Sequence, residues 1–194
     1  MNKDSKIVIV GVGALGSHTA MFLRNVGNLT FVDHDRTEAK NILSQFHTKM
    51  GSGKNKALGL QQALLGLFGV KAEAVPHRLV PDNAEAILGS AGLVIDCTDN
   101  AAARRCIQTY VRSKNIPCLH GCLSLDGQFA RVIWDDIFKE DEEGIEGQAT
   151  CEDGQNLPFH ALAGAQIAIV AQRFLKTGVR TSLMLLPDKI IQIA

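Results

Sequence analysis

The sequence has no excess of charge of either sign, because 20 lysine and arginine residues balance 20 aspartate and glutamate residues. This balance gives no electrostatic reason to expect nucleic acid or an anionic membrane as a partner. The chain also lacks an uninterrupted apolar stretch of about 18 residues, the length that predicts a transmembrane helix. Its N-terminal apolar run meets a glycine turn too early to form the core of a signal peptide. We therefore expect a cytoplasmic protein that binds neither nucleic acid nor membrane.

The five cysteines are an odd number and include no C-x-x-C pair. This usage fits a reducing compartment rather than a disulfide framework. Cys118 and Cys122 have no second pair or histidine cluster at metal-ligand spacing, so we expect no structural zinc. His47 and His160 are expected in ordinary surface or capping roles. With no internal repeat, 194 residues and 46% hydrophobic content predict one domain that spans residues 1–194.

Short β-rich runs alternate with helical patterns along most of the chain, which predicts parallel strands joined by crossover helices. The predicted strands are residues 6–10, 29–32, 70–75, 93–96, 116–119 and 128–134. The predicted helices are residues 15–26, 54–68, 83–88, 101–113 and 159–175. Two final runs, 181–186 and 189–194, predict a hairpin, and residues 135–154 predict a surface loop. The expected fold is a Rossmann-like, doubly wound α/β fold whose mostly parallel sheet has a mixed C-terminal part.

A glycine motif follows the first predicted strand directly. Gly11, Gly13 and Gly16 form G-x-G-x-x-G between that strand and a helix. Such a turn lets backbone N–H groups approach phosphate, and the helix N-terminus favours negative charge. Asp33 ends the second predicted strand, where a carboxylate can accept hydrogen bonds from ribose hydroxyls. These features predict a nucleotide site in preference to a merely structural turn, but they leave NAD and ATP open.

Three further stretches distinguish between NAD and ATP as the ligand: VDHDRTEAKNILSQ, GSGKNKA and DCTDNAAAR. Together with the glycine turn they resemble the ThiF/MoeB family, the bacterial relatives of ubiquitin-activating enzymes. The family pattern has D-x-D after the second strand, then Asn-Leu-x-Arg-Gln, a lysine before a helix, and D-x-x-D-N-x-x-x-R after the fourth strand. The matching residues are Asp33, Asp35, Asn41, Gln45, Lys56, Asp96, Asp99, Asn100 and Arg104. The resemblance extends from about residue 6 to residue 175.

The resemblance implies an adenylyltransferase that uses ATP and Mg²⁺. Its implied substrate is the C-terminal carboxylate of a small ubiquitin-like sulfur carrier ending in Gly-Gly, with pyrophosphate as the leaving group. Asn41, Lys56 and Arg104 would orient phosphates, and Asp99 would ligate magnesium, whose charge offsets that of the leaving pyrophosphate. Hydride transfer needs none of these groups. The acidic residues could alternatively be caps for the next helix.

The chain departs from the family pattern at Ser44, where the family has arginine. Lys49 or Lys54 could supply the missing charge, although neither is at the matching position. The resemblance is to a short form, without the N-terminal helix or the zinc cysteines of longer members, and it implies a homodimer. The apolar helix 159–175 fits either the core or a subunit contact. A catalytically reduced binding member of the family stays an alternative, as does, with less support, an NAD-dependent oxidoreductase.

Cys151 is the candidate nucleophile, because some relatives pass the activated carboxylate to a cysteine as a thioester or acyl persulfide. It follows the acidic stretch of the loop 135–154, where the family places its crossover segment. A nearby helix N-terminus favours the thiolate, whereas the adjacent Glu152 and Asp153 oppose it. The loop and the strand before it could also guide the carrier's tail. Cys97 and Cys106 are expected to be small core residues.

Overall fold

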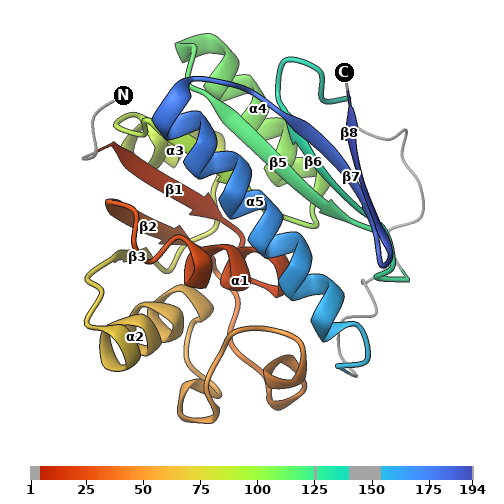
Figure 1. Cartoon of the computed structure of the whole chain (residues 1–194). Helices are drawn as coiled ribbons and strands as arrows, with labels where there is room; N and C mark the ends of the chain where they lie inside the picture. Colours follow the sequence, from red (N-terminus) through yellow and green to blue (C-terminus); the bar gives the residue numbers. More distant parts are fainter. Residues whose placement is uncertain (1–4, 125, 140–153, 194) are drawn as a thin grey trace.

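The computed structural model describes residues 5–124, 126–139 and 154–193 (Figure 1). Eight strands form one sheet in the order β3-β2-β1-β4-β5-β6-β7-β8. β3, β2, β1, β4 and β5 are parallel, and the pairs β5–β6, β6–β7 and β7–β8 are antiparallel. The strands are β1 (Lys6–Val10), β2 (Asn28–Val32), β3 (Glu73–Val75), β4 (Leu93–Asp96), β5 (Cys118–Leu123), β6 (Ala130–Trp134), β7 (Ser182–Leu186) and β8 (Lys189–Ile193). The predicted fold class and the C-terminal hairpin are confirmed.

Helices cover both faces of the sheet. They are α1 (Ala14–Phe22), α2 (Lys56–Phe68), α3 (Pro81–Leu88), α4 (Ala101–Lys114) and α5 (Leu157–Thr177), with short 3₁₀ helices η1 (Ala39–Leu43) and η2 (Lys49–Gly51). Figure 1 shows α5 and α1 in front of the sheet and α3 and α4 behind it. None of the helices among the described residues has the length and apolar character needed to cross a membrane.

The central strand β1 is buried on both faces, as a parallel strand between two helical layers must be. Ile7 and Ile9 belong to the core shared with α1, α2 and α5, whereas Val8 and Val10 belong to the core shared with α3 and α4. All four side chains are at most 3% exposed. This alternation, with a period of two, divides the interior into two hydrophobic clusters.

The structure corrects some predicted element boundaries. Helix α1 ends at Phe22 rather than at residue 26, because the chain turns there and the Val26 N–H bonds the Leu23 carbonyl at 2.8 Å. Strand β3 begins at residue 73 rather than 70. The Val70 N–H instead bonds the Leu64 carbonyl at 3.3 Å and helps to end α2, where Gly69 has φ +69°.

Helix α5 packs against α1 over a contact without room for a side chain. At Gly164 a Cβ atom would lie 2.7 Å from His18 Cβ and 3.0 Å from the Thr19 backbone nitrogen. The Thr19 hydroxyl donates a hydrogen bond to the Gly164 carbonyl at 3.4 Å. The apolar character of α5 is thus largely explained by the core of this chain, in which Ala163 and Ile167 are fully buried.

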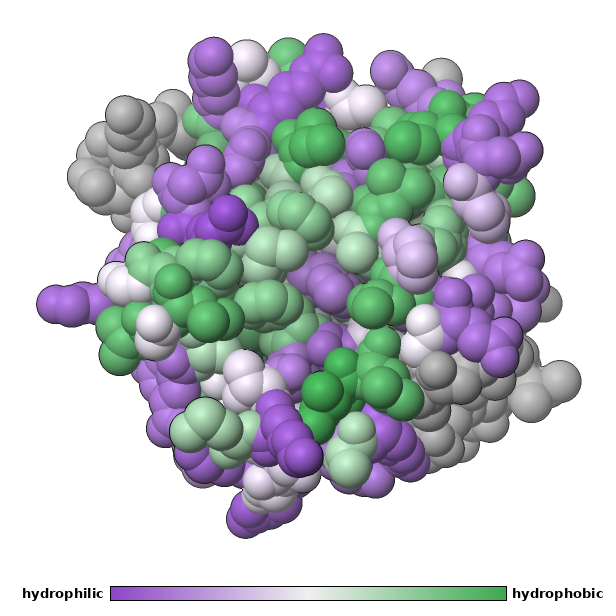
Figure 2. All heavy atoms as spheres, turned by 60° about the horizontal axis from the view of Figure 1, so that its bottom comes forward, coloured by the Kyte–Doolittle hydropathy of each residue, from purple (hydrophilic) through white to green (hydrophobic). Residues whose placement is uncertain are grey.

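Hydrophobic side chains also stay on the surface. Figure 2 shows the side of the molecule that is lowest in Figure 1, where hydrophobic residues gather over the middle and hydrophilic residues lie mainly around the border. Exposed large hydrophobic residues of the described chain include Leu43, Met50, Leu67 and Ile169.

Two histidines lie buried below the glycine turn, which corrects the surface or capping role expected for His47. The His47 Nε2–H donates to the Val12 carbonyl at 2.8 Å, and the His18 Nε2–H donates to the Ser44 carbonyl at 3.2 Å. Burial lowers the pKa of His47 to about 4, against the opposing effect of the bond to Val12. Burial also lowers the pKa of His18, so both rings are uncharged at neutral pH. His160 is also fully buried.

The α1–α5 contact predicts opposite effects for two helical glycines. Gly164→Ala should lower the free energy of unfolding by about 1 kcal/mol, because overpacking costs more than the better helix propensity of alanine contributes. Gly66→Ala on the open face of α2, where a Cβ atom meets nothing within 4 Å, should raise it by about 0.5 to 1 kcal/mol. Urea denaturation of both variants measures the difference, and equal stability would contradict the close packing.

The buried state of His47 predicts a pH-dependent stability. Its folded pKa of about 4 lies below the ordinary 6.5, so the unfolded chain binds more protons between these values and stability falls as pH drops below 6.5. From pH 7 to pH 5 the loss from this group is about 2 kcal/mol. His47→Gln should remove that part of the loss in urea denaturation at the two pH values. His77→Gln, at an exposed histidine, should keep the wild-type dependence, and an equal dependence in His47→Gln would refute the assignment.

Candidate active site

A cleft of about 710 Å³ opens at the carboxyl ends of β1, β2 and β4. Its walls come from the glycine turn, the segment after β2, the start of α2, residues 77–81, the segment after β4, and β5. The predicted site residues that line it are Gly11, Gly13, Asp33, Asp35, Asn41, Gln45, Lys56 and Asp99. Gly16 and Arg104 lie outside its lining, and Cys151 lies outside the described residues. The carboxyl edge of a parallel sheet is where open α/β folds bind ligands.

Each glycine of the turn has its own physical reason. Gly11 has φ +79°, and a Cβ atom there would lie 2.8 Å from the Cys97 carbonyl oxygen. At Gly16 a Cβ atom would lie 1.9 Å from the Gly11 carbonyl oxygen, so only glycine lets α1 approach the turn. At Gly13 a Cβ atom would meet only Gln45 Nε2, at 3.9 Å. Gly13 therefore leaves room beside the backbone at the start of α1 for a phosphate.

The Asp33 carboxylate joins the turn to the segment after β2. Its Oδ2 accepts a hydrogen bond from the Val12 N–H at 2.8 Å, and its Oδ1 accepts one from the Asp35 N–H at 2.9 Å. Burial raises the pKa of Asp33, while these two N–H groups and Lys56 act in the opposite direction. The carboxylate is thus fixed at the cleft wall, and each oxygen keeps acceptor capacity for a ligand hydroxyl.

Lys56 reaches the cleft from the first turn of α2. Its Nζ lies 3.3 Å from Asp35 Oδ2, and its side chain is 12% exposed. Asn55 caps the helix by accepting the Leu58 N–H at 3.2 Å, and its amide donates to the Asp33 carbonyl at 2.8 Å. The start of α2 is therefore tied to the D-x-D segment, which places the ammonium group at the cleft.

The segment made of η1 and the two residues after it brings Asn41 and Gln45 to the cleft, whereas Ser44 is buried. Asn41 Oδ1 accepts the Glu38 N–H at 2.9 Å, which closes the first turn of η1. Gln45 Oε1 is buried with no hydrogen-bond partner among the described residues. Ser44 is fully buried and does not line the cleft. Ser44 therefore contributes no group to the cleft wall.

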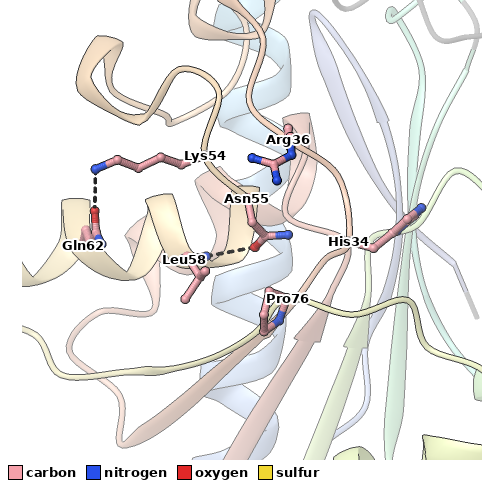
Figure 3. A pocket seen from close by; sticks show the side chains of 7 residues that line it. All are labelled: His34, Arg36, Lys54, Asn55, Leu58, Gln62 and Pro76. Carbon is pink, nitrogen blue, oxygen red and sulfur yellow. Dashed lines mark hydrogen bonds between the residues drawn. The ribbon is translucent and has the colours of Figure 1, made fainter.

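Neither lysine expected to compensate for Ser44 lines the cleft. Lys54 Nζ donates to Gln62 Oε1 at 3.0 Å and faces a separate pocket of about 420 Å³. Figure 3 shows Lys54 pointing along α2 toward Gln62, while His34 points the other way. The basic residues that do line the cleft, besides Lys56 and histidines, are Arg36, Lys40 and Arg78.

The polar residues at the end of β4 and just after it have three different roles. Asp96 is fully buried, and its Oδ1 accepts the Thr98 N–H at 2.9 Å and the Thr98 hydroxyl at 2.7 Å. Asn100 caps α4 by accepting the Ala103 N–H at 3.0 Å. Asp99 is exposed and lines the cleft. The helix cap is therefore Asn100, which leaves the Asp99 carboxylate for another role.

Arg104 points back at this segment. Its Nη2 donates to the Thr98 carbonyl at 2.5 Å, and its Nε lies 3.5 Å from Asp96 Oδ2. The side chain is 19% exposed. Contact of Arg104 with phosphates stays a prediction, whereas its contact with the segment that carries Asp99 is direct.

The cysteines of the described residues fit the expected structural roles in part. Cys118 and Cys122 are buried on β5. Cys97 and Cys106 are only partly buried, and both line the cleft. Burial raises the pKa of the Cys97 thiol, which keeps it protonated and unreactive at neutral pH.

The sequence patterns assign no site role to His120 and Asp135, which the structure joins to Asp96. His120 lies beside Asp96 in the register of the parallel pair β4–β5. The signal that could have found this pair is the position of both residues on neighbouring strands near the carboxyl edge. Asp135 lies just beyond β6, and its approach depends on the antiparallel pairing of β5 and β6.

Comparison with known proteins places these residues in a family. The ThiF family model matches residues 2–174. Molybdopterin-synthase adenylyltransferase of Escherichia coli is 31% identical over 140 residues, 69% of this chain and 56% of that protein. Sulfur carrier protein adenylyltransferase of Thermus thermophilus is 35% identical over 133 residues, 66% of this chain and 49% of that protein. The chain thus spans about half the length of these relatives.

Solved structures agree on the fold. The crystal structure of E. coli MccB with ATP superposes with a TM-score of 0.76 at 16% identity, covering 98% of this chain and 64% of that chain. E. coli MccB with MccA-N7isoASN gives a TM-score of 0.80, also at 16% identity, covering 98% of this chain and 64% of that chain. The matched range includes the glycine turn, the D-x-D segment and the D-x-x-D-N segment that surround the cleft, and the chain belongs to the ThiF family.

Proposed function

We propose that this chain adenylates the C-terminal carboxylate of a small ubiquitin-like sulfur carrier that ends in Gly-Gly, using ATP and releasing pyrophosphate. The observation that carries the proposal is the convergence on one cleft of the glycine turn, Asp33, Lys56 and Asp99 from three separate strand ends. The names of the relatives, adenylyltransferases of molybdopterin synthase and of a sulfur carrier protein, support the same reaction class.

The cleft fits the parts of a nucleotide. The open backbone at Gly13 and the N-terminus of α1 suit a phosphate group. The Asp33 carboxylate, held by two backbone N–H groups, suits ribose hydroxyls. Gln45 Oε1 is buried at the cleft and has no partner in the described part of the chain, so a ligand donor would complete its hydrogen bonding.

The charges of the cleft favour ATP over NAD. ATP carries about four negative charges, and preorganised cations stabilise the charge that develops on a leaving phosphate. Lys56, Arg36, Lys40 and Arg78 line the same cleft. Hydride transfer would use neither this number of cations nor the exposed Asp99 carboxylate. The oxidoreductase alternative is supported only by the glycine turn and Asp33.

Asp99 is the residue that we propose to hold Mg²⁺. Its carboxylate belongs to the hard oxygen ligands that magnesium prefers, and it has no capping role. Bound magnesium would neutralise charge on the phosphate oxygens. Asp33, His34 and Asp35 also place ligand atoms within 4.8 Å of one another, but Asp33 binds backbone N–H groups and Asp35 pairs with Lys56. The two carboxylates of this cluster therefore already have partners within the chain.

The proposed reaction is a displacement at the α-phosphorus. A carboxylate oxygen of the carrier forms a bond to this atom, and the bond from the α-phosphorus to the bridging oxygen of the β-phosphate breaks. Pyrophosphate leaves with the electron pair, so the products are an acyl-adenylate and pyrophosphate. In this scheme Lys56 and Asn41 orient phosphates and the glycine turn holds the nucleotide in place.

We propose that Lys40 supplies the charge that the family places at the position of Ser44. Lys40 lies in η1 next to Asn41, lines the cleft and is 43% exposed. Its Nζ lies 3.5 Å from Glu38 Oε2, an exposed pairing that a phosphate could replace at little cost. Ser44 itself is buried away from the cleft, so a compensating cation must come from a neighbouring position.

The remaining expectations belong to the same proposal. A homodimer and docking of a protein carrier belong to the proposal, and the hydrophobic surface seen in Figure 2 is where we expect such contacts. A cytoplasmic location and a later thioester or persulfide step at Cys151 stay predictions. Most of the loop expected to guide the carrier's tail, including Cys151, lies outside the described residues.

Pyrophosphate exchange into ATP, measured with a panel of small proteins that end in Gly-Gly, tests the reaction. Asp99→Ala should lower the exchange rate at least a hundredfold, about the effect of removing one charge-stabilising group. Its melting temperature should stay that of the wild type, because Asp99 is exposed and caps no helix. Asp82→Ala, at an exposed carboxylate outside the cleft lining, is the matched control and should retain exchange.

Two outcomes would contradict the proposal. Wild-type exchange in Asp99→Ala would remove this residue from the mechanism. A wild-type protein that binds ATP but supports exchange with none of the carriers would favour the catalytically reduced, binding-only alternative.

The role of Lys40 is tested by comparing two nucleotides. Lys40→Ala should weaken ATP binding about tenfold in calorimetry, equivalent to about 1.4 kcal/mol, and leave AMP binding unchanged, because only ATP has the outer phosphates. Lys49→Ala, at a lysine of η2 outside the cleft lining, should change neither affinity. Unchanged ATP affinity in Lys40→Ala would exclude Lys40 as the compensating cation.

A further inference from the structure

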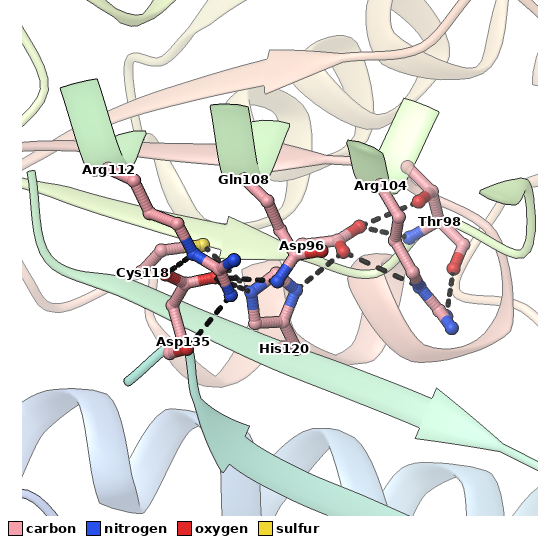
Figure 4. A network of polar contacts seen from close by, with 8 residues as sticks. All are labelled: Asp96, Thr98, Arg104, Gln108, Arg112, Cys118, His120 and Asp135. Atoms are coloured by element: carbon pink, nitrogen blue, oxygen red, sulfur yellow. Dashed lines mark hydrogen bonds and ion pairs between the residues drawn. The ribbon is translucent and has the colours of Figure 1, made fainter. Parts of the chain in front are cut away.

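A fully buried histidine on β5 connects Asp96 at the end of β4 with Asp135 just beyond β6. His120 on β5 is 0% exposed. Its Nδ1 lies 2.8 Å from Asp96 Oδ2, and its Nε2 lies 3.0 Å from Asp135 Oδ1 (Figure 4). The Phe138 ring stacks on the imidazole with centroids 4.2 Å apart. The ring is therefore fixed at both nitrogens and on one face.

The two carboxylates determine the charge of this ring. Burial alone would lower the pKa of His120, but the hydrogen bonds to Asp135 and Asp96 outweigh it and raise the pKa to about 12. Both ring nitrogens consequently carry protons and donate, one to each carboxylate. A buried charge needs such partners because its desolvation is otherwise too costly.

Asp96 connects the fixed ring to Thr98, which lines the cleft. One of its oxygens accepts from His120, and the other holds the N–H and hydroxyl of Thr98. Arg104 holds the carbonyl of the same threonine at 2.5 Å. Thr98 is thus fixed at its N–H, its hydroxyl and its C=O, immediately before Asp99.

Asp135, the second carboxylate bound to the ring, is held by α4. It accepts from Gln108 Nε2 at 2.9 Å and from Arg112 Nε at 2.7 Å. Arg104, Gln108 and Arg112 follow one another at four-residue spacing, so a single face of α4 contacts both carboxylates. Figure 4 shows these three side chains descending from α4 onto Asp96, His120 and Asp135.

We propose that His120 is a positioning residue: held between Asp96 and Asp135, it fixes the segment 97–100 and so sets the place of the Asp99 carboxylate in the cleft. This inference rests on the proposed role of Asp99. Without the ring, Asp96 would stay buried with Arg104 as its remaining charged partner. Either protonation of Asp96 or a closer approach of Arg104 would then change the bonds that hold Thr98.

Hydrogen exchange measured by NMR tests this proposal without requiring activity. In His120→Gln the Thr98 amide, bonded to Asp96, should exchange at least tenfold faster than in the wild type. The Val12 amide, which is bonded to Asp33 in the same cleft, is the internal control and should be unchanged. Cys118→Ala removes another neighbour of His120, with Sγ 3.6 Å from Nε2, and should leave both amides unchanged. An unchanged Thr98 amide in His120→Gln would overturn the proposal.

Nucleotide binding supplies a second readout that a purely structural role would not move. His120→Gln should weaken binding of ATP with Mg²⁺ about tenfold in calorimetry, and leave binding of ATP in EDTA within twofold of wild type. Equal loss of both affinities would overturn the proposal. If the wild type binds ATP but supports no pyrophosphate exchange, the proposed reaction fails, while the Thr98 amide and the magnesium dependence still decide the role of His120.

A measurement on the wild type covers the case in which His120→Gln does not fold. The ¹⁵N spectrum of the His120 ring at neutral pH should show both nitrogens protonated, with N–H protons that exchange slowly. A ring with only one protonated nitrogen could not donate to both Asp96 and Asp135 and would overturn the proposal. Asp135→Asn, which removes only the outer carboxylate charge, should also speed Thr98 exchange, and wild-type protection in a folded Asp135→Asn would count against the proposal.

Discussion

The cleft depends on the Asp33 carboxylate, which fixes two loops with one side chain. Its oxygens hold the Val12 N–H of the glycine turn and the Asp35 N–H of the next crossover. Asp35 in turn pairs with Lys56 at the start of α2. Because parallel strands end at a common edge, this chain of contacts holds the glycine turn, the segment after β2 and the start of α2 around one cleft.

Sequence patterns predicted the features that depend on neighbouring residues alone, such as the glycine turn and the buried strand β1. Gly11 is recognisable because its φ is positive, and Gly16 because a Cβ atom there would lie 1.9 Å from the Gly11 carbonyl oxygen. The apolar run Ile7–Val10 follows from burial of β1 on both faces of the sheet. Element ends were less predictable. Val70 has strand propensity, yet its N–H is used to terminate α2. Of the cleft lining, the sequence predicted the residues that directly follow a strand, such as Gly11, Asp33 and Asp99.

The parts that the sequence did not predict depend on contacts between distant segments. Spacing alone could not tell that Lys54 turns toward Gln62 or that Ser44 faces inward, because both depend on how the segment after β2 folds back on α2 and α1. His120 acquires its importance only from Asp135, which the antiparallel half of the sheet brings to it. The cleft is thus held at two places: Asp33 holds the glycine turn and the segment after β2, and the Asp96–His120–Asp135 network holds Thr98, next to Asp99.

The central claim is that this cleft accommodates a magnesium-bound triphosphate. Calorimetric titration of the protein with ATP and Mg²⁺, and separately with NAD, tests it most directly. The account predicts saturable binding of one ATP that strengthens when Mg²⁺ is added, and at least tenfold weaker binding of NAD. Tighter binding of NAD, or ATP binding that Mg²⁺ does not strengthen, would contradict it.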